Sequence, residues 1–415
     1  MLLRFLKSED GNYAAIFAIA MIPIMSGVAG LVDYNGTSTN ASKLQESLDA
    51  TALAIGTKYF SGITQAEIDK FGSDFFAANI RRNGISFSNG DQMPLSGNFD
   101  QVVNFAATAQ KDGQDINISA SAQLNHKAFI GGNSSWKALR KSKVVFKPGQ
   151  PSCVLALHGH ASDAVKVQGS TQVTLDGCVI AANSDASDSV SRGGSAQLGA
   201  KCVSTVGRTA GLTGVNTNLT CGSALEKQYP SLDPLADVVP PAYTTCKSMP
   251  GGKTKSLSPG TYCNKVWSGD ITLSAGTYIL RGGQIKLGGN GKLVGHGVTI
   301  FLMEGAEFTT NANETIDLSP PTTGTYAGIT VYQEKANTLT LTINGTADSK
   351  LTGFIYAPGA HVFYAGNSNM AGSGDCIRVI GDTIELTGNS KIAANCAAAL
   401  GNRDMYAGRV IMLVK

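Results

Sequence analysis

The 415-residue sequence predicts an N-terminal transmembrane helix, a small α+β domain and a C-terminal all-β domain, preferably a parallel β-helix. Three observations predict this order. An uncharged apolar stretch comes first, helical and then alternating apolar patterns follow it, and short strands separated by Gly-rich turns fill the rest. The predicted boundaries are a cytoplasmic N-terminus at 1–10, a transmembrane helix at 11–33, an α+β domain at 34–147 and a β-solenoid at 148–415.

The transmembrane helix is predicted from the length of the uncharged stretch. Asn12 to Val32 comprises 21 residues, and at about 1.5 Å per residue it is roughly 30 Å long, the thickness of the hydrocarbon core. It has no polar face of the kind that a core helix shows, and Pro23 is tolerated in membrane spans. A cleaved secretory signal is the alternative, because the small residues of "SGVAG" form a possible cleavage site.

The distribution of basic residues predicts the orientation. Arg4 and Lys7 precede the stretch, whereas the first basic residue after it is Lys43. By the positive-inside tendency, the N-terminus is expected in the cytoplasm and the remainder of the chain is expected to be exported. The net charge is only +3, and 15% of residues are charged. No polyanion-binding surface is therefore indicated, and nucleic acid is not an expected partner.

The α+β domain is predicted from two helical patterns followed by alternating strands. Apolar residues recur at helical spacing in "NASKLQESLDATALAIGTKYF", and the stripe consists of Leu44, Leu48, Ala52 and Ile55. A second helix follows, with Thr64 and Glu67 at the spacing of a capping box. Alternating strands are expected in "FDQVVNFAATAQ" and "DINISASAQLNHKAF", joined by a turn at Asp112-Gly113, and a third strand is expected in "KSKVVFK".

The stripe Leu44, Leu48, Ala52 and Ile55 has two possible roles. The first is an interaction surface that pairs with another protein by helix packing. The second is a core face that packs on the strands predicted within residues 99–127.

The C-terminal part alternates short Val-, Ile-, Thr- and Leu-rich strands with Gly, Asn and Ser turns, and no helical pattern separates the strands. The phrase "LSPGTY" at 257–262 returns as "LSAGTY" at 273–278, a step that suits one coil of a solenoid. These features favour a parallel β-helix, and a β-sandwich is the alternative.

All eight cysteines follow residue 150, and none belongs to a CxxC pair. An even number of cysteines in an exported region predicts disulfides, whereas free buried thiols are the alternative. Pairing of nearest neighbours would close loops about as long as one solenoid coil. The hypothesis therefore comprises Cys153–Cys178, Cys202–Cys221, Cys246–Cys263 and Cys376–Cys396.

The N-terminal region resembles the TadE/TadG-like proteins of Flp (Tad) pilus assembly. The family pattern has a Gly-containing start, an apolar span, an Asp and then a helix of the form LQxxxDxxALA. The matching positions are Gly11, Asp33, Leu44, Gln45, Asp49, Ala52, Leu53 and Ala54. The Gly- and Cys-rich remainder resembles an extension of TadG-like proteins. The resemblance implies a bacterial inner-membrane anchor, a periplasmic body and other pilus-assembly proteins as partners. Prepilin-like members carry a glutamate where this chain has Ile16, so cleavage is not expected.

Metal and catalytic sites are not expected. Some TadG-like proteins carry a DxSxS metal motif, and this chain has Asp185, Ser187 and Ser189 at that spacing, but the amphipathic helix that should follow is missing. His158 and His160 flank a glycine, and without a further ligand they form a weak metal site. We therefore expect no catalytic residue, no metal and no cofactor.

The expected function is that of a non-catalytic, single-pass inner-membrane component of the pilus-assembly machinery, a scaffold or anchor in the cell envelope. Two other classes are weighed against it. The first alternative is a surface adhesin or glycan-binding protein that uses exposed aromatic residues such as Tyr326, Tyr332, Tyr356, Phe363 and Tyr364. The second is a β-helix polysaccharide-degrading enzyme, for which the scattered carboxylates give no convergent site.

Overall fold

The computed structural model describes residues 12–59, 64–88, 100–113, 115–127, 135–170, 172–346, 348–366, 376–388, 391–393, 400 and 404–414. Contacts divide the chain into two compact units, residues 1–147 with 410–415 and residues 148–409. The predicted β-solenoid, 148–415, therefore includes residues 410–415, which belong to the first unit. The reason is that the last strand, β27 (Tyr406–Val414), leaves the second unit after Arg409.

Helix α2 is continuous from Asn12 to Tyr59, a length of 48 residues that includes Pro23. The predicted transmembrane helix and the amphipathic helix after it are thus one helix. Its two halves differ in environment. The apolar side chains between Ile16 and Val32 are mostly exposed, whereas the stripe in the second half is buried. The exposed half is long and apolar enough to cross a membrane, by length and composition.

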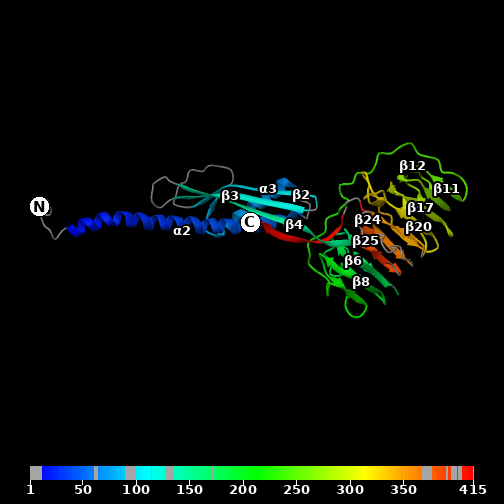
Figure 1. Cartoon of the computed structure of the whole chain (residues 1–415), viewed down its shortest axis with the longest axis horizontal. Helices are drawn as coiled ribbons and strands as arrows, with labels where there is room; N and C mark the ends of the chain where they lie inside the picture. The colour runs from blue at the N-terminus through cyan, green and yellow to red at the C-terminus, as the bar shows by residue number, and fades with distance from the viewer. Residues whose placement is uncertain are drawn as a thin grey trace. The chain divides into compact units, whose positions relative to one another are not determined.

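The first unit places two helices on one face of a sheet (Figure 1). Its other elements are α3 (Gln65–Arg82), β1 (Ser86–Phe87), β2 (Gln101–Asp112), β3 (Asp115–Lys127) and the first part of β4 (Ser135–Ala156). The predicted capping box begins α3, because Glu67 N–H donates to the Thr64 hydroxyl and Thr64 N–H donates to the Glu67 carboxylate. Strands β2 and β3 form the predicted antiparallel hairpin, and β4 pairs antiparallel with β3.

The core of the first unit follows from the period of two in β3. The alternate residues Ile116, Ile118, Ala120, Ala122 and Leu124 are buried. Helix α2 packs on β3 and on α3, and α3 packs on β2. Burial of such aliphatic side chains contributes roughly 25 cal/mol per Å² of apolar surface removed from water.

Gly56 of α2 permits the close approach of the helix to the sheet. A Cβ at this position would lie 2.2 Å from two ring carbons of Phe146 on β4. We expect Gly56→Ala to lower the free energy of unfolding of the first unit by about 1–3 kcal/mol, as overpacking does. Chemical denaturation in detergent would measure the change.

Two variants control this prediction. A Cβ added at Gly27 would have no neighbouring atom within 4 Å, so Gly27→Ala should leave stability unchanged or slightly higher. Adding Phe146→Leu to Gly56→Ala should recover part of the loss. Equal stability of the Gly27→Ala and Gly56→Ala proteins would contradict the close packing.

The second unit consists of short strands. In chain order they are β5 (Val165–Val167), β6 (Gln172–Ala182), β7 (Val190–Arg192), β8 (Gln197–Thr205), β9 (Thr209–Ala210), β10 (Thr217–Leu219), β11 (Thr254–Leu257), β12 (Gly260–Cys263), β13 (Val266–Trp267), β14 (Asp270–Leu273), β15 (Gly276–Arg281), β16 (Gln284–Ile285), β17 (Lys292–His296), β18 (Val298–Met303), β19 (Glu307–Phe308), β20 (Thr315–Ser319), β21 (Ile329–Gln333), β22 (Leu341–Gly345), β23 (Lys350–Leu351), β24 (Gly353–Gly366), β25 (Ile377–Gly388) and β26 (Lys391–Ala393).

Parallel ladders join these strands in three sheets. The largest contains the run β12-β15-β18-β21-β24-β25-β4-β6-β8. A second contains β11-β14-β17-β20-β23, and a third contains β13-β16-β19. The largest sheet has 19 strands and is mixed, because β4 pairs antiparallel with β3 and parallel with β6. The C-terminal part is thus largely β, as predicted.

The chain does not wind through the second unit from one end to the other. It enters at β4, continues through β6 and β8 to β10, and then follows an irregular connection at 220–253 to β11 at the opposite end. From β11 it returns strand by strand until β25 pairs with β4, with Val379 opposite Val154. In Figure 1 the labels follow this order, with β24 and β25 between β20 and β6.

The repeated phrases occupy equivalent places in neighbouring coils. Leu257 of the first phrase pairs with Leu273 of the second. The Tyr262 hydroxyl donates to the Ser258 carbonyl at 2.8 Å, and the Tyr278 hydroxyl donates to the Ser274 carbonyl at 2.7 Å. Each phrase therefore forms the same corner, closed by the same hydrogen bond.

Three of the hypothesised disulfides are present. Cys153 is joined to Cys178, Cys202 to Cys221 and Cys246 to Cys263, with Cα–Cα distances of 5.8, 5.4 and 5.6 Å. Cys376 is also disulfide-bonded, and its hypothesised partner Cys396 lies outside the described residues. Cys202–Cys221 and Cys246–Cys263 lie at opposite ends of the strand order, beside β8 and β12.

Candidate functional site

The predicted interaction surface on α2 is not accessible. Leu44, Leu48, Ala52 and Ile55 each have 0% relative exposure and lie in the core of the first unit. The prediction that this stripe is a free surface for a partner is therefore wrong, and the alternative, packing on the strands, is what the structure shows. The cause is the sheet: its buried face needs an apolar cover, and the stripe provides it.

The polar residues of the family motif connect α2 to its surroundings. Gln45 donates to the Asp49 carboxylate at 2.8 Å and to the Lys141 carbonyl of β4 at 3.1 Å. Leu53 is 37% exposed, and Gly11 lies outside the described residues. The motif thus contains core residues and a hydrogen bond to the sheet.

Asp33, another residue of the motif, belongs to a buried cluster with His126 and Asp100. His126 Nδ1 lies 2.6 Å from Asp100 Oδ1, and His126 Nε2 lies 3.8 Å from Asp33 Oδ1. The relative exposures of the three side chains are 7% for Asp33, 10% for Asp100 and 13% for His126. Asn40 on α2 donates a further hydrogen bond to Asp100. We call these three residues the Asp33–His126–Asp100 cluster.

Three separate elements supply the cluster. Asp33 follows the apolar stretch of α2, Asp100 lies directly before β2, and His126 is near the end of β3. The backbone carbonyl of Asp100 accepts the N–H of Ser86 at 3.2 Å and its hydroxyl at 2.9 Å, which holds this residue in place. Since a buried carboxylate needs a charged or hydrogen-bonding partner, the imidazole between two carboxylates fixes α2 to the hairpin.

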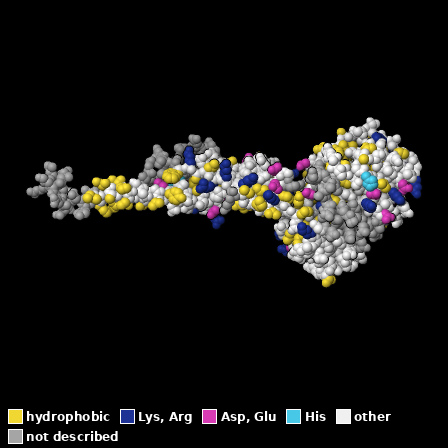
Figure 2. Space-filling model, in the orientation of Figure 1, with side chains coloured by type: hydrophobic (Ala, Val, Ile, Leu, Met, Phe, Trp, Pro, Cys, Tyr) yellow, Lys and Arg dark blue, Asp and Glu magenta, His cyan; other side chains and the backbone are white. Residues whose placement is uncertain are grey.

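The position of the cluster marks a change of environment along α2. Before Asp33 the helix exposes large apolar side chains, among them Ile22 (67%) and Leu31 (70%). After Asp33 one face of the helix packs on the strands. Figure 2 shows the apolar side chains gathered on the exposed part of the helix. The contact of Asp33 with His126 therefore joins the apolar half of α2 to the folded unit.

No motif in the sequence singles out His126. A signal was nevertheless present. The alternation that buries Ile116 through Leu124 continues to His126, which puts the imidazole on the buried face of β3. The pairing with Asp33 required the helix to be placed against the strand, and the sequence does not supply that placement.

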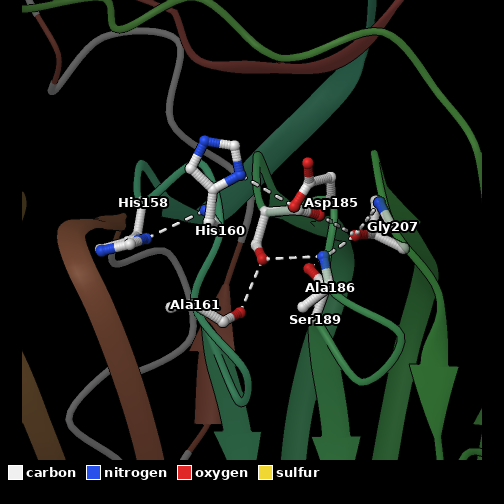
Figure 3. A network of polar contacts seen from close by, with 9 residues as sticks. His158, His160, Ala161, Asp185, Ala186, Ser189 and Gly207 are labelled. Atoms are coloured by element: carbon white, nitrogen blue, oxygen red, sulfur yellow. Dashed lines mark hydrogen bonds and ion pairs between the residues drawn. The ribbon is translucent and has the colours of Figure 1, made fainter.

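The two histidines that flank Gly159 are not joined as a metal site. His160 Nδ1 lies 3.0 Å from Asp185 Oδ1, and both side chains are exposed (Figure 3). His158 Nδ1 instead accepts the backbone N–H of His160 at 3.0 Å. Within the described part of the chain no group of three His, Cys, Asp or Glu side chains could hold a metal ion.

The DxSxS residues also serve the turn between strands. The Ser189 hydroxyl is buried and lies 2.8 Å from Thr205 Oγ1. The neighbouring Ser184 hydroxyl donates to the Ala161 carbonyl at 2.6 Å. These contacts occupy the Ser189 hydroxyl and the adjacent Ser184 hydroxyl with hydrogen bonds inside the protein, and they favour the structural role for this motif.

The aromatic residues considered for adhesion are largely covered. Tyr364 lies in the core. Tyr332 and Tyr356 are 7% and 4% exposed, because the connection at 220–253 packs over them through Leu235 and Val238. Burial, together with the nearby Asp233 carboxylate, raises the pKa of the Tyr356 hydroxyl, which donates to Asp233 at 2.8 Å.

The hydrogen bond between Tyr356 and Asp233 should hold the connection in place. We expect Tyr356→Phe to lower the stability of the second unit by about 1–3 kcal/mol, because the half-buried Asp233 carboxylate loses a donor. Tyr364→Phe is the matched control, since the Tyr364 hydroxyl has no hydrogen-bond partner among the described residues. It should be neutral or stabilising. Limited proteolysis within 220–253 would report the difference, and equal cleavage rates would contradict the role of Tyr356.

Comparison with known families gives two matches. Residues 11–55 match the model described as "Putative Flp pilus-assembly TadE/G-like". The N-terminal segment is TadE/G-like. Residues 230–395 match a family described as "Domain of unknown function (DUF7305)". No curated protein and no solved structure matches this chain.

The TadE/G-like segment coincides with most of α2. It contains the exposed apolar half, Asp33 and the buried stripe. The second match begins within the connection at 220–253 and continues into β26. It therefore covers the strands that return from β11 to the middle of the second unit.

Proposed function

We propose that this chain is a membrane-anchored, non-enzymatic component of Flp pilus assembly. One observation carries the proposal: the TadE/G-like segment lies on a helix with an apolar, exposed first half and a second half that forms the core of a folded unit. Such a helix is suited to hold a folded body at a membrane surface. Other pilus-assembly proteins are the proposed partners.

The proposed orientation has the N-terminus in the cytoplasm and both units in the periplasm. Arg4 and Lys7 support it through the positive-inside tendency. The disulfides Cys153–Cys178, Cys202–Cys221 and Cys246–Cys263 also support it, because such bonds persist in oxidising compartments.

We further infer that the second unit is a parallel β-helix. The parallel ladders and the shared aliphatic core are the supporting observations. In such a solid rod each coil packs on its neighbours, which makes it a stiff scaffold. A scaffold is favoured over an enzyme. Glu304 and Glu307 are close in sequence, as a pair of catalytic carboxylates could be, but Glu304 forms an ion pair with Arg281 at 2.7 Å.

A genetic experiment tests the proposed role. Deletion of this gene should leave pilin in the cell and abolish surface pili. The full-length chain should restore them. A chain in which residues 1–33 are replaced by a cleavable secretion signal should not, because the folded units would be released from the membrane.

Other outcomes would overturn the proposal. A deletion strain with normal pili and lost attachment would indicate adhesion, and turnover of a glycan by the purified protein would indicate an enzyme. Protease treatment of intact spheroplasts tests the orientation separately. Protection of both units from protease would contradict a periplasmic location.

A further inference from the structure

The end of the first unit nearest to the exposed half of α2 carries four residues that no motif includes. They are Tyr34, Lys127, Trp136 and Lys137, which we call the interfacial patch. Tyr34 is 65% exposed and Trp136 is 49% exposed. Lys137 is exposed and Lys127 is half-buried.

Pairing and contacts determine where the patch lies along α2. A Cβ at Gly36 would lie 3.2 Å from His126, whereas Gly56 contacts Phe146, which pairs with Ile116 of β3. Strand β3 therefore runs antiparallel to α2. Its last residue, Lys127, lies about 3.3 Å beyond His126 in the direction of the apolar half.

Trp136 is at the same level as Asp33. It pairs directly with His126, whose imidazole contacts Asp33, so Trp136 and Tyr34 flank the position where the apolar stretch ends. Trp and Tyr combine an apolar ring with a polar group, and they are enriched where a membrane meets water. The other tryptophan, Trp267, is fully buried. The two tryptophans of the chain therefore differ, and only Trp136 is exposed to solvent.

The two lysines give the interfacial patch a positive charge on the sheet face that points away from His126. Lys127 and Lys137 pair with Ser135 and Asn125 across the strands, and both lie on the face of the sheet opposite to His126. The carboxylates Asp33 and Asp100 point inward to His126. Among the described residues, the cluster therefore withdraws the acidic groups and leaves the lysines to meet a negatively charged surface.

We propose that the interfacial patch binds the anionic phospholipid surface of the membrane that α2 spans. Tyr34 and Trp136 lie among the headgroups, and Lys127 and Lys137 pair with lipid phosphates. This second contact restricts rotation and tilt of the first unit about the helix. The inference rests on the proposed membrane insertion of α2, and the chemistry of the patch identifies lipid rather than protein as its partner.

Quenching of tryptophan fluorescence tests this contact with the full chain. The protein is reconstituted into vesicles of phosphatidylcholine and phosphatidylglycerol, with and without lipids brominated near the headgroup. We expect the brominated lipids to remove most of the Trp136 emission. The Trp136→Phe protein retains only Trp267, which is buried in the second unit, and its emission should be unaffected by bromine.

Two further measurements separate the possible outcomes. Replacing Lys127 and Lys137 with Gln, or omitting phosphatidylglycerol, should reduce the quenching of Trp136. Resistance to alkaline extraction reports insertion of α2 independently. Extraction-resistant protein with unquenched Trp136 would overturn the lipid contact and leave the anchor intact, whereas extractable protein would overturn both. If quenching depended neither on phosphatidylglycerol nor on the two lysines, the proposed pairing of Lys127 and Lys137 with lipid phosphates would be overturned.

Discussion

His126→Ala should destabilise the first unit by about 3–5 kcal/mol, the loss expected when a buried carboxylate is left without its partner. The variant leaves Asp33 and Asp100 facing each other without the imidazole, at 7% and 10% exposure. Amide hydrogen exchange of β3 in detergent measures the effect. Exchange that requires opening of the unit should accelerate by about two to four orders of magnitude.

Matched variants identify the source of this loss. His296 lies 3.7 Å from Asp317, but its side chain is 63% exposed. His296→Ala should therefore change stability by less than about 1 kcal/mol. Adding Asp33→Asn to His126→Ala should recover part of the loss, because one uncompensated charge is removed. If His126→Ala had no larger effect than His296→Ala, the Asp33–His126–Asp100 cluster would not stabilise the contact between α2 and the β2–β3 hairpin.

Removal of either terminal disulfide should cost the second unit about 3 kcal/mol, the value expected for loops of this size. The bonds close separations of 19 residues for Cys202–Cys221 and 17 residues for Cys246–Cys263. Each holds the outermost segment of the strand order. Cys221 N–H donates to the Lys201 carbonyl at 2.9 Å, and Lys247 N–H donates to the Thr261 carbonyl at 2.7 Å.

The two double Cys→Ser variants should have local effects that differ. Loss of Cys246–Cys263 should accelerate hydrogen exchange first in β12 and β15, and loss of Cys202–Cys221 should do so in β8 and β10. This follows because coils of a stack contact mainly their neighbours. Uniform acceleration throughout the second unit in both variants would contradict the assignment of these bonds to opposite ends.

The stripe on α2 shows how far a helical period predicts function. The spacing of Leu44, Leu48, Ala52 and Ile55 predicts an apolar face, and the structure contains that face. Whether a partner or the same chain covers it depends on strands that begin about fifty residues later. The sheet of the same unit has an apolar face that must be buried, and it belongs to the same chain as the stripe. The stripe on α2 therefore packs on this face.

The candidate site was partly predictable. Asp33 emerged from the family motif, and the period of two could have placed His126 on the buried face of β3. Asp100 carried no such signal, since it precedes its strand. The meeting of the three side chains depends on the antiparallel direction of β3 relative to α2, which local patterns do not encode.

Local patterns predict the long apolar helix, the capping box, the hairpin at Asp112-Gly113, the short strands and three of the disulfides that the structure contains. The tertiary structure is needed to show that the stripe is core, that His126 lies between two carboxylates and that β25 pairs with β4. Local periods depend on the geometry of a few consecutive residues. Neighbours distant in sequence depend instead on which apolar faces bury one another, and that is a property of the whole chain.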